Sequence, residues 1–258
     1  MAKISVAMAV YNGEKYLPKQ LDSILKQLEP QDEIIVSYDK SKDGTWELLQ
    51  SYAAKYPQIR VICNDHPGIN GNFNNALTAA TGDYLFICDQ DDCWADNKRA
   101  AVVETFLRTG ADMVIHNGVH IDCDDQVISQ PFFTMYRIGD GKVKNILKPR
   151  YSGCCTAFTR EMAQKILPIP QDIDAYDHWV GTVGEFMGKI AYDERILLYH
   201  RLHGENVTTS TRSIGRILKA RMGLLKHLHK RMRQERSKHH GKCWTGRGCG
   251  GCLQCCLR

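Results

Sequence analysis

The chain has 258 residues, of which 43% are hydrophobic, and its formal net charge is +5. This length is enough for one sizeable hydrophobic core, and the composition excludes collagen, coiled coils and wholesale disorder. After Thr211 the chain carries 13 lysines and arginines but one acid, which leaves 21 basic and 28 acidic residues in the body before it. Because this body is acidic, we expect no nucleic-acid partner.

The first apolar run, Ile4–Val10, has features of both a signal peptide and a buried strand. One lysine precedes it and no small-residue cleavage site follows it. All apolar runs are far shorter than the roughly 20 residues of a membrane span. We therefore interpret Ile4–Val10 as the first strand and expect a cytoplasmic protein.

Short β-rich runs alternate with helical patterns through the first half of the chain. The spacing of apolar residues predicts strands at Ile4–Val10, Glu33–Ser37, Ile59–Cys63 and Tyr84–Cys88, and helices at Leu17–Leu28, Thr45–Tyr56 and Phe73–Ala80. Strands separated by helices of this length predict an α/β fold with a parallel sheet and helices on both faces. In such sheets ligands bind at the carboxyl ends of the strands.

The second half is less regular. The same patterns predict helices at Lys98–Arg108, Arg160–Ile166 and after Asp177, strands at Met113–His116, Gly153–Phe158 and Ile190–Tyr199, and a loop-rich stretch from Asp122 to Arg150. A long basic helix is predicted from Ser213 to about Arg236, and a Gly/Cys-rich tail follows it.

Asp89, Asp91 and Asp92 directly follow the fourth predicted strand. Carboxylates gathered at the end of a buried strand are costly unless a cation binds them. Oxygen ligands suit a hard cation, Mg²⁺ or Mn²⁺. The alternative is a solvated turn, because Asp-rich turns are common, and a bare motif needs structural context to distinguish the two.

Three segments, in this order, resemble the motifs of the family 2 inverting glycosyltransferases. They are Ser5 to Gln27, Glu33 to Thr45, and Ala80 to Trp94, and the last has the form found in rhamnosyltransferase-like members. The resemblance covers roughly residues 3–210. It implies a GT-A fold, which is a Rossmann-like mixed sheet flanked by helices. A nucleotide-binding half at about 1–95 and an acceptor-binding half at about 96–211 would form one catalytic domain, 1–211.

The resemblance also implies roles for residues of the first half. The nucleotide base would be bound by Val10, Tyr11, Asn12 and Asp39, with Asp39 accepting a hydrogen bond from a uracil or thymine imide. Asp89 would lie near the ribose and the metal, and Asp91 would be the main ligand of Mn²⁺ or Mg²⁺. Two departures leave the nucleotide open, because Tyr38 replaces an acid and Lys40 replaces a glycine of the family pattern.

In the second half, Asp177 matches the family's catalytic base, and His178 is a weaker candidate. Asp177 is also an acid at a helix N-terminus, where the macrodipole favours it for structural reasons. His203 matches a family histidine that approaches the metal or the diphosphate, with an exposed surface loop as the alternative. Gly153, Cys154 and Trp179 resemble parts of the family's acceptor-binding region.

The resemblance therefore implies transfer of a sugar from dTDP-rhamnose or a UDP-hexose to an acceptor hydroxyl in cell-surface polysaccharide or glycolipid synthesis. A nucleotidyltransferase is disfavoured, because Tyr11-Asn12-Gly13-Glu14 lacks the Gly-rich basic loop that such enzymes carry after the first strand. A catalytically degenerate nucleotide-sugar-binding or scaffold protein remains as a second hypothesis. The Tyr38 substitution favours it, and intact Asp89, Asp91 and Asp177 oppose it.

The basic helix, at about 212–236, is amphipathic. One stripe contains Ile214, Ile217, Leu218, Leu225, Leu228 and Met232, flanked by lysines and arginines. Such a helix binds a membrane surface or packs on the catalytic domain, and both can hold. We expect peripheral association with the inner face of the plasma membrane and a glycan or lipid-linked acceptor. The tail, 237–258, is either disordered or binds a metal through Cys249, Cys252 and Cys255.

Overall fold

The computed structural model describes residues 2–203 and 214–244. Four parallel strands form the first half of one sheet: β1 (Ile4–Val10), β2 (Glu33–Tyr38), β3 (Ile59–Cys63) and β4 (Tyr84–Cys88). The helices that connect them are α1 (Leu17–Leu25), α2 (Thr45–Lys55) and α3 (Ile69–Ala79). All seven residues of β1 are buried, because β1 lies between β2 and β4 with helices on both faces.

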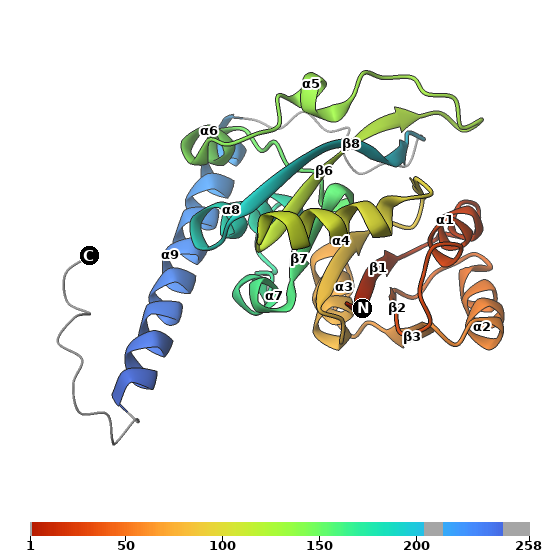
Figure 1. The fold of residues 1–258 in the computed structure, drawn as a ribbon, viewed down its shortest axis with the longest axis horizontal. Helices are drawn as coiled ribbons and strands as arrows, with labels where there is room; N and C mark the ends of the chain where they lie inside the picture. Colours follow the sequence, from red (N-terminus) through yellow and green to blue (C-terminus); the bar gives the residue numbers. More distant parts are fainter. Residues whose placement is uncertain (1, 204–213, 245–258) are drawn as a thin grey trace.

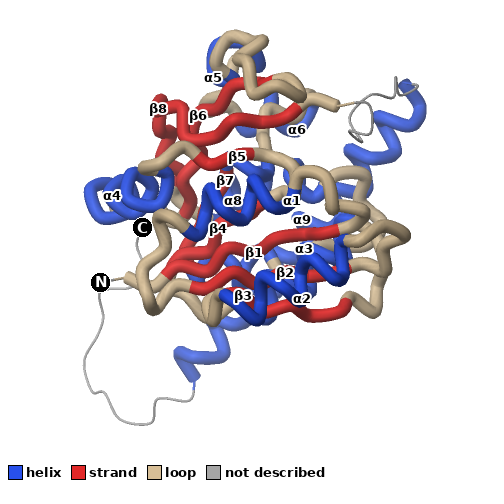
Figure 2. The backbone as a smooth tube through the Cα atoms, turned by 90° about the vertical axis from the view of Figure 1, so that its right-hand side faces the viewer, coloured by secondary structure: helices blue, strands red, loops and turns tan. Residues whose placement is uncertain are grey.

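The second half adds β5 (Cys93–Trp94), β6 (Met113–Ile121), β7 (Thr156–Thr159) and β8 (Ile190–Arg201) to the same sheet. The strand order is β3-β2-β1-β4-β7-β6-β8-β5 (Figure 2). β7 runs antiparallel to both β4 and β6, and β5 runs antiparallel to β8, while β6 and β8 are parallel. The sheet is therefore mixed, as the family resemblance implies, and the parallel arrangement predicted from the alternating elements holds for β1–β4.

The remaining helical segments are α4 (Lys98–Thr109), α5 (Phe132–Tyr136), α6 (Lys142–Leu147), the 3₁₀ turn Gly153–Cys155, α7 (Arg160–Ile166), α8 (Tyr176–Met187) and α9 (Ile214–Trp244). Alternating residues of β1 divide between two core clusters on opposite faces of the sheet. One cluster contains α1, α2 and α4, and the other contains α3, α7, α8 and α9. Figure 1 shows α9 along one side of the molecule, on the opposite side from the β1–β3 half.

Several predicted boundaries are wrong. The strand predicted at Gly153–Phe158 begins only at Thr156, because the backbone first forms a 3₁₀ turn in which Cys155 N–H donates to the Ser152 carbonyl. The loop-rich stretch contains α5 and α6, and β6 extends five residues beyond the predicted His116.

The C-terminal helix α9 ends at Trp244 rather than near Arg236. The predicted metal ligands Cys249, Cys252 and Cys255 lie outside the described residues. Among the helices at 2–203 and 214–244, none has the length and hydropathy needed to cross a bilayer.

Candidate active site

The polar residues predicted at the strand ends meet at one edge of the sheet. β1 pairs with β2 so that Val10 lies opposite Tyr38, and β1 pairs with β4 so that Met8 lies opposite Cys88. The residues that follow these strands, Tyr11, Asp39 and Asp89, are therefore neighbours, since all three strands point the same way.

Asp39 is held rigidly at this edge. Its carboxylate accepts hydrogen bonds from the Asn64 side chain at 2.7 Å and from the Gly68 backbone N–H at 2.9 Å. Gly68 has a φ of 109°, a backbone conformation that favours glycine. Asp39 is 6% exposed. A carboxylate has about four acceptor positions, so these two bonds orient Asp39 and leave capacity for a ligand donor.

Gln90 joins the ends of β1 and β4. Its side-chain amide accepts from the Tyr11 backbone N–H and donates to the Tyr11 carbonyl, both at 2.8 Å. A Cβ at Gly13 would lie 2.6 Å from the same Gln90 oxygen, so a side chain at position 13 would displace the Gln90 amide. The Tyr11 ring is half exposed, and its backbone is fixed against β4. No motif in the sequence indicates this role for Gln90.

Val10 and Asn12 have supporting positions. Val10 is wholly buried in the core. Asn12 has a φ of 48°, and its side-chain oxygen accepts from the Lys42 backbone N–H at 2.9 Å. Its own N–H donates to the Ser41 hydroxyl, also at 2.9 Å. Asn12 therefore ties the loop after β1 to the loop after β2. Of the consecutive residues Val10, Tyr11 and Asn12, Tyr11 is the most exposed.

Asp91 and His203 are in direct contact. The His203 Nε2 donates to the Asp91 carboxylate at 2.7 Å, and the His203 ring stacks on Tyr16 with centroids 5.0 Å apart. His203 follows β8, so a histidine from the end of the second half lies beside an acid of the first half.

Asp89 is in contact with the first residue of α8. Its carboxylate accepts a hydrogen bond from the Tyr176 hydroxyl at 3.4 Å. Burial, followed by the negative charges of Asp92 and Asp91, raises the pKa of Asp89 to about 8. The charge of Asp177 also raises the pKa of Asp89, so Asp177 acts on the cluster from α8.

Asp92 forms an ion pair beneath the site. Its carboxylate accepts from His200 Nδ1 at 2.8 Å and from the Arg201 backbone N–H at 3.1 Å. Burial disfavours the imidazolium, but the adjacent Asp92 carboxylate raises the pKa of His200 to about 10. The pair joins the acidic segment to β8. No sequence pattern indicates a role for His200, apart from its position three residues before the predicted His203.

Asp177 and Tyr176 begin α8, which faces the acidic residues from the second half of the sheet. Asp177 is partly exposed, and its carboxylate accepts from the His178 backbone N–H at 2.7 Å. Tyr176 is buried and packs on Phe73 with ring centroids 4.3 Å apart. A Cβ at Gly153 would lie 2.1 Å from the Tyr176 hydroxyl oxygen, so Gly153 makes room for the ring that contacts Asp89.

Cys154 and Trp179 occupy interior positions. Cys154 is 3% exposed, and its carbonyl accepts from the buried Lys98 ammonium at 2.9 Å. Trp179 is fully buried, and its indole N–H donates to the Ile166 carbonyl. Both side chains are therefore part of the hydrophobic core. His178 is likewise buried, and it bonds to α6 and α9 instead of to the acidic residues.

The chemistry of the strand-end residues fits a hard divalent cation. Asp89 and Asp91 offer carboxylate oxygens where like charges accumulate in a largely buried place. Asp89, Asp91 and His203 do not themselves gather within 4.8 Å; among the described residues Asp92, Cys154 and His200 are the trio that does. Because Asp92 is already bonded to His200 and Arg201, we interpret that trio as structural.

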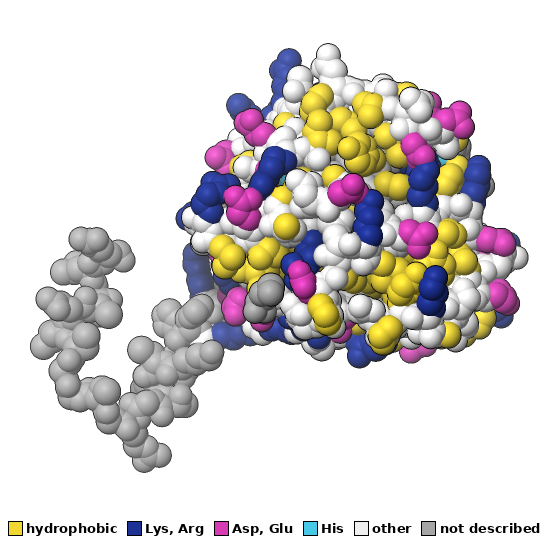
Figure 3. Space-filling view, turned by 45° about the vertical axis from the view of Figure 1, so that its right-hand side comes forward, with side chains coloured by type: hydrophobic (Ala, Val, Ile, Leu, Met, Phe, Trp, Pro, Cys, Tyr) yellow, Lys and Arg dark blue, Asp and Glu magenta, His cyan; other side chains and the backbone are white. Residues whose placement is uncertain are grey.

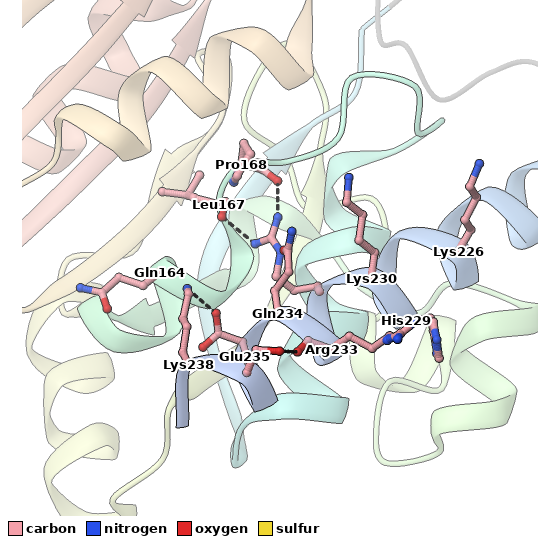
Figure 4. Close-up of a pocket in the computed structure, with 12 residues that line it drawn as sticks. Gln164, Leu167, Pro168, Lys226, His229, Lys230, Arg233, Gln234, Glu235 and Lys238 are labelled. Atoms are coloured by element: carbon pink, nitrogen blue, oxygen red, sulfur yellow. Dashed lines mark hydrogen bonds and ion pairs between the residues drawn. The ribbon is translucent and has the colours of Figure 1, made fainter. Parts of the chain in front are cut away.

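A groove lies away from the strand-end residues. It has a volume of about 890 Å³ and runs between the end of α7 and the C-terminal part of α9 (Figure 4). Its lining includes Lys226, His229, Lys230 and Arg233. It contains no strand-end acid, so its size does not make it the catalytic site.

Comparison with known proteins agrees with this geometry. Residues 5–167 match the model of glycosyl transferase family 2. The uncharacterized glycosyltransferase alr2836 of Nostoc sp. is 30% identical over 214 residues, covering 79% of this chain and 66% of its own length. An Escherichia coli protein named UDP-Glc:alpha-D-GlcNAc-diphosphoundecaprenol beta-1,3-glucosyltransferase WfaP is 27% identical over 214 residues, covering 81% of each chain. The chain spans 60–66% of the length of the first curated relatives that it matches.

The fold is also that of solved glycosyltransferases. Residues 1–349 of S. aureus TarS, in complex with UDP-GlcNAc, superpose with a TM-score of 0.69 at 18% identity, covering 89% of this chain and 66% of that one. At this identity the likeness establishes the fold, which is GT-A, as expected. With a family model matching more than half of its residues, the chain belongs to glycosyl transferase family 2.

Proposed function

We propose that this protein is an inverting glycosyltransferase that moves a sugar from a nucleotide diphosphate to an acceptor hydroxyl. The observation that carries the proposal is that the start of α8, Tyr176 and Asp177, adjoins the strand-end acids, because the Tyr176 hydroxyl donates to the Asp89 carboxylate at 3.4 Å. The donor diphosphate would bind on the side of the strand-end acids, and the acceptor would enter on the side of α8.

In the proposed reaction the acceptor oxygen attacks the anomeric carbon from the face opposite the diphosphate. Asp177 takes the proton of the acceptor hydroxyl as the new C–O bond forms. The bond from the anomeric carbon to the diphosphate breaks, and its electron pair leaves with the diphosphate. Asp91, Asp89 and His203 would hold Mn²⁺ or Mg²⁺, which supplies positive charge against the leaving group.

The base of the donor nucleotide would bind beside Tyr11 and Asp39. The exposed Tyr11 ring offers a stacking surface, and Asp39 is oriented by Asn64 and Gly68 as an acceptor for an imide N–H. Both uracil and thymine have such an imide, so we propose a UDP-hexose or dTDP-rhamnose as the donor. The name of WfaP and the UDP-GlcNAc complex of TarS support this nucleotide class.

We propose a glycan or lipid-linked acceptor for cell-surface polysaccharide or glycolipid synthesis, with peripheral membrane association. The name of WfaP, which includes a diphosphoundecaprenol, supports the lipid-linked form. The test is release of nucleoside diphosphate from a panel of UDP-, dTDP- and GDP-sugars, with an undecaprenyl-diphosphate-linked sugar as acceptor and Mn²⁺ present. The account predicts acceptor-dependent release with one donor and a product of inverted anomeric configuration by NMR. A retained configuration would contradict it.

A second candidate is a degenerate family member that binds nucleotide sugars without transferring them. Tyr38, which replaces an acid of the family pattern, favours it. In the structure the Tyr38 hydroxyl accepts from the Ser41 backbone N–H at 3.0 Å, and the ring contacts Trp46. Tyr38 therefore orders the loop that carries Asp39. Saturable nucleotide-sugar binding without turnover would favour this candidate.

A further inference from the structure

Two helices of the second half present apolar side chains to solvent. On α6, Val143 is 71% exposed and Leu147 is 66% exposed. On α9, Leu218, Met222 and Leu225 are exposed, with Met222 at 65%. The stripe predicted from the sequence is therefore split, because Leu228 of that stripe is buried against the core while Leu218 and Leu225 are not.

The two helices adjoin through Arg221. The Arg221 Nε donates to the Leu147 carbonyl at 3.3 Å. Leu218 and Leu225 lie three residues before and four residues after Arg221, so both are on its flank of the helix. Figure 1 shows α6 beside the first turns of α9. The exposed apolar side chains of these two adjoining helices are Val143, Leu147, Leu218, Met222 and Leu225, and we call this set the α6–α9 face.

Lysines flank the α6–α9 face on both helices. The exposed lysines are Lys142, Lys144 and Lys148 around α6, and Lys219, Lys226 and Lys230 on α9. From residue 214 to residue 244 the sequence has one acid, Glu235. Figure 4 shows Lys226, Lys230 and Arg233 projecting from α9 along the groove. By contrast, the face drawn in Figure 3 intersperses acidic and basic side chains.

We propose that the α6–α9 face docks on the surface of an anionic lipid bilayer. Apolar side chains flanked by lysines suit the boundary between acyl chains and headgroups, where lysines meet anionic headgroups. A second copy of the chain is a poorer occupant, because symmetric pairing of this face would bring lysines against lysines. Separately exposed apolar residues are normal, but five on two adjoining helices, flanked by lysines, indicate an interaction surface.

The docked face would place the bilayer next to the proposed catalytic base. His178 Nε2 donates to the Asn145 carbonyl of α6 at 2.9 Å, and its Nδ1 accepts from Arg221 of α9 at 3.2 Å. His178 of α8 therefore contacts both α6 and α9. Because His178 directly follows Asp177, these contacts lie one residue from the proposed base. This step rests on the proposed function, because a lipid-linked acceptor would then reach Asp177 from the membrane side. The docking surface itself stands without it.

The test is co-sedimentation of the full chain with vesicles of phosphatidylcholine and phosphatidylglycerol, compared with pure phosphatidylcholine. We expect binding to the anionic vesicles that falls steeply with salt and is weak on neutral vesicles. We expect two variants to weaken vesicle binding by about tenfold or more: the double variant Leu218→Asp with Met222→Asp, and the single variant Leu147→Asp. Each variant removes the burial of at least one apolar side chain in the bilayer. The matched control is Leu107→Asp on α4, where Leu107 is 72% exposed, and it should bind as wild type.

Three results would overturn the proposal. The first is that the wild type does not bind anionic vesicles, and the second is that Leu107→Asp weakens binding as much as the other variants do. The third is a concentration-dependent dimer that Leu218→Asp abolishes, because a second copy of the chain would then be the occupant of this face. Melting temperatures of all variants confirm that they fold. Nucleotide-sugar binding by the same variants is measured in parallel, without vesicles. If it fails while vesicle binding succeeds, the proposed function fails and the docking surface stands.

Discussion

His203 and Asp91 are 112 residues apart in the chain, yet the His203 imidazole donates to the Asp91 carboxylate at 2.7 Å. The contact exists because β8 returns beside β5, which follows the acidic segment. The contact therefore joins the two halves of the chain at the proposed metal site.

Asp91→Asn should abolish the ion-dependent part of donor binding. The amide retains the shape of the side chain but loses the negative charge that a divalent ion requires. We expect kcat/KM to fall at least about a hundredfold, or about 2.7 kcal/mol of transition-state stabilisation. The measurement is initial rate against Mn²⁺ concentration. Asp96→Asn is the control, because Asp96 pairs with Lys26 at the surface, and an equal loss there would refute the assignment.

Asp177→Asn should lower kcat by about 10²–10⁴-fold, because it removes the proposed general base. Donor binding should be unchanged, as measured by the shift in melting temperature on adding nucleotide sugar. Asp174→Asn provides a matched acid three residues earlier in the exposed segment before α8. A normal kcat in Asp177→Asn would exclude Asp177 as the base.

His178 should make the protein sensitive to acid. Burial, and then the Arg221 charge, lower the pKa of His178 to about 4 from an unfolded value of about 6.5. A base with a depressed pKa contributes stability that is fully present above pH 6.5 and is lost as the pH falls towards 4. The resulting loss in the free energy of unfolding is of the order of 3 kcal/mol.

The measurement for His178 is urea unfolding at pH 7.5 and 4.5. His178→Gln should be less stable at the higher pH and should lose less stability on acidification than the wild type. His66→Gln, at an exposed position, should follow the wild type. Equal pH dependence in all three proteins would show that His178 is not a titrating group in this range.

Gly153→Ala should destabilise the fold and disturb the site together. Its Cβ would meet the Tyr176 hydroxyl and ring within 2.5 Å, and Tyr176 contacts Asp89. We expect a loss of about 1–3 kcal/mol in the free energy of unfolding, typical of overpacking. Gly223→Ala on α9 meets open space and should be neutral or stabilising. Equal stability of the two variants would contradict the packing described for Tyr176.

The first half could be predicted from the sequence because its elements are periodic and local. β1, β3 and β4 have the predicted bounds, and the acids after β4 lie where strand order implies. The pairing of β6 with both β7 and β8, and the two-residue β5, depend on contacts between distant segments. No local pattern encodes such pairings.

The supporting residues were missed for a similar reason. Gln90, Tyr176 and His200 act through partners more than 75 residues away in the sequence. The division of α9 into a buried and an exposed apolar side depends on where α7 and α8 lie. The helical spacing of apolar residues predicts the apolar stripe of α9, but it does not predict which part of the stripe packs against the core.

The central claim is a metal-dependent nucleotide-sugar site at the strand ends. Its most direct test is the melting temperature of the full chain against UDP-, dTDP- and GDP-sugars, with and without Mn²⁺, for the wild type and Asp91→Ala. The account predicts a rise with one uracil or thymine nucleotide sugar that requires Mn²⁺ and disappears in the variant. A rise that is independent of Mn²⁺ and of Asp91, or no rise with any donor, would contradict it.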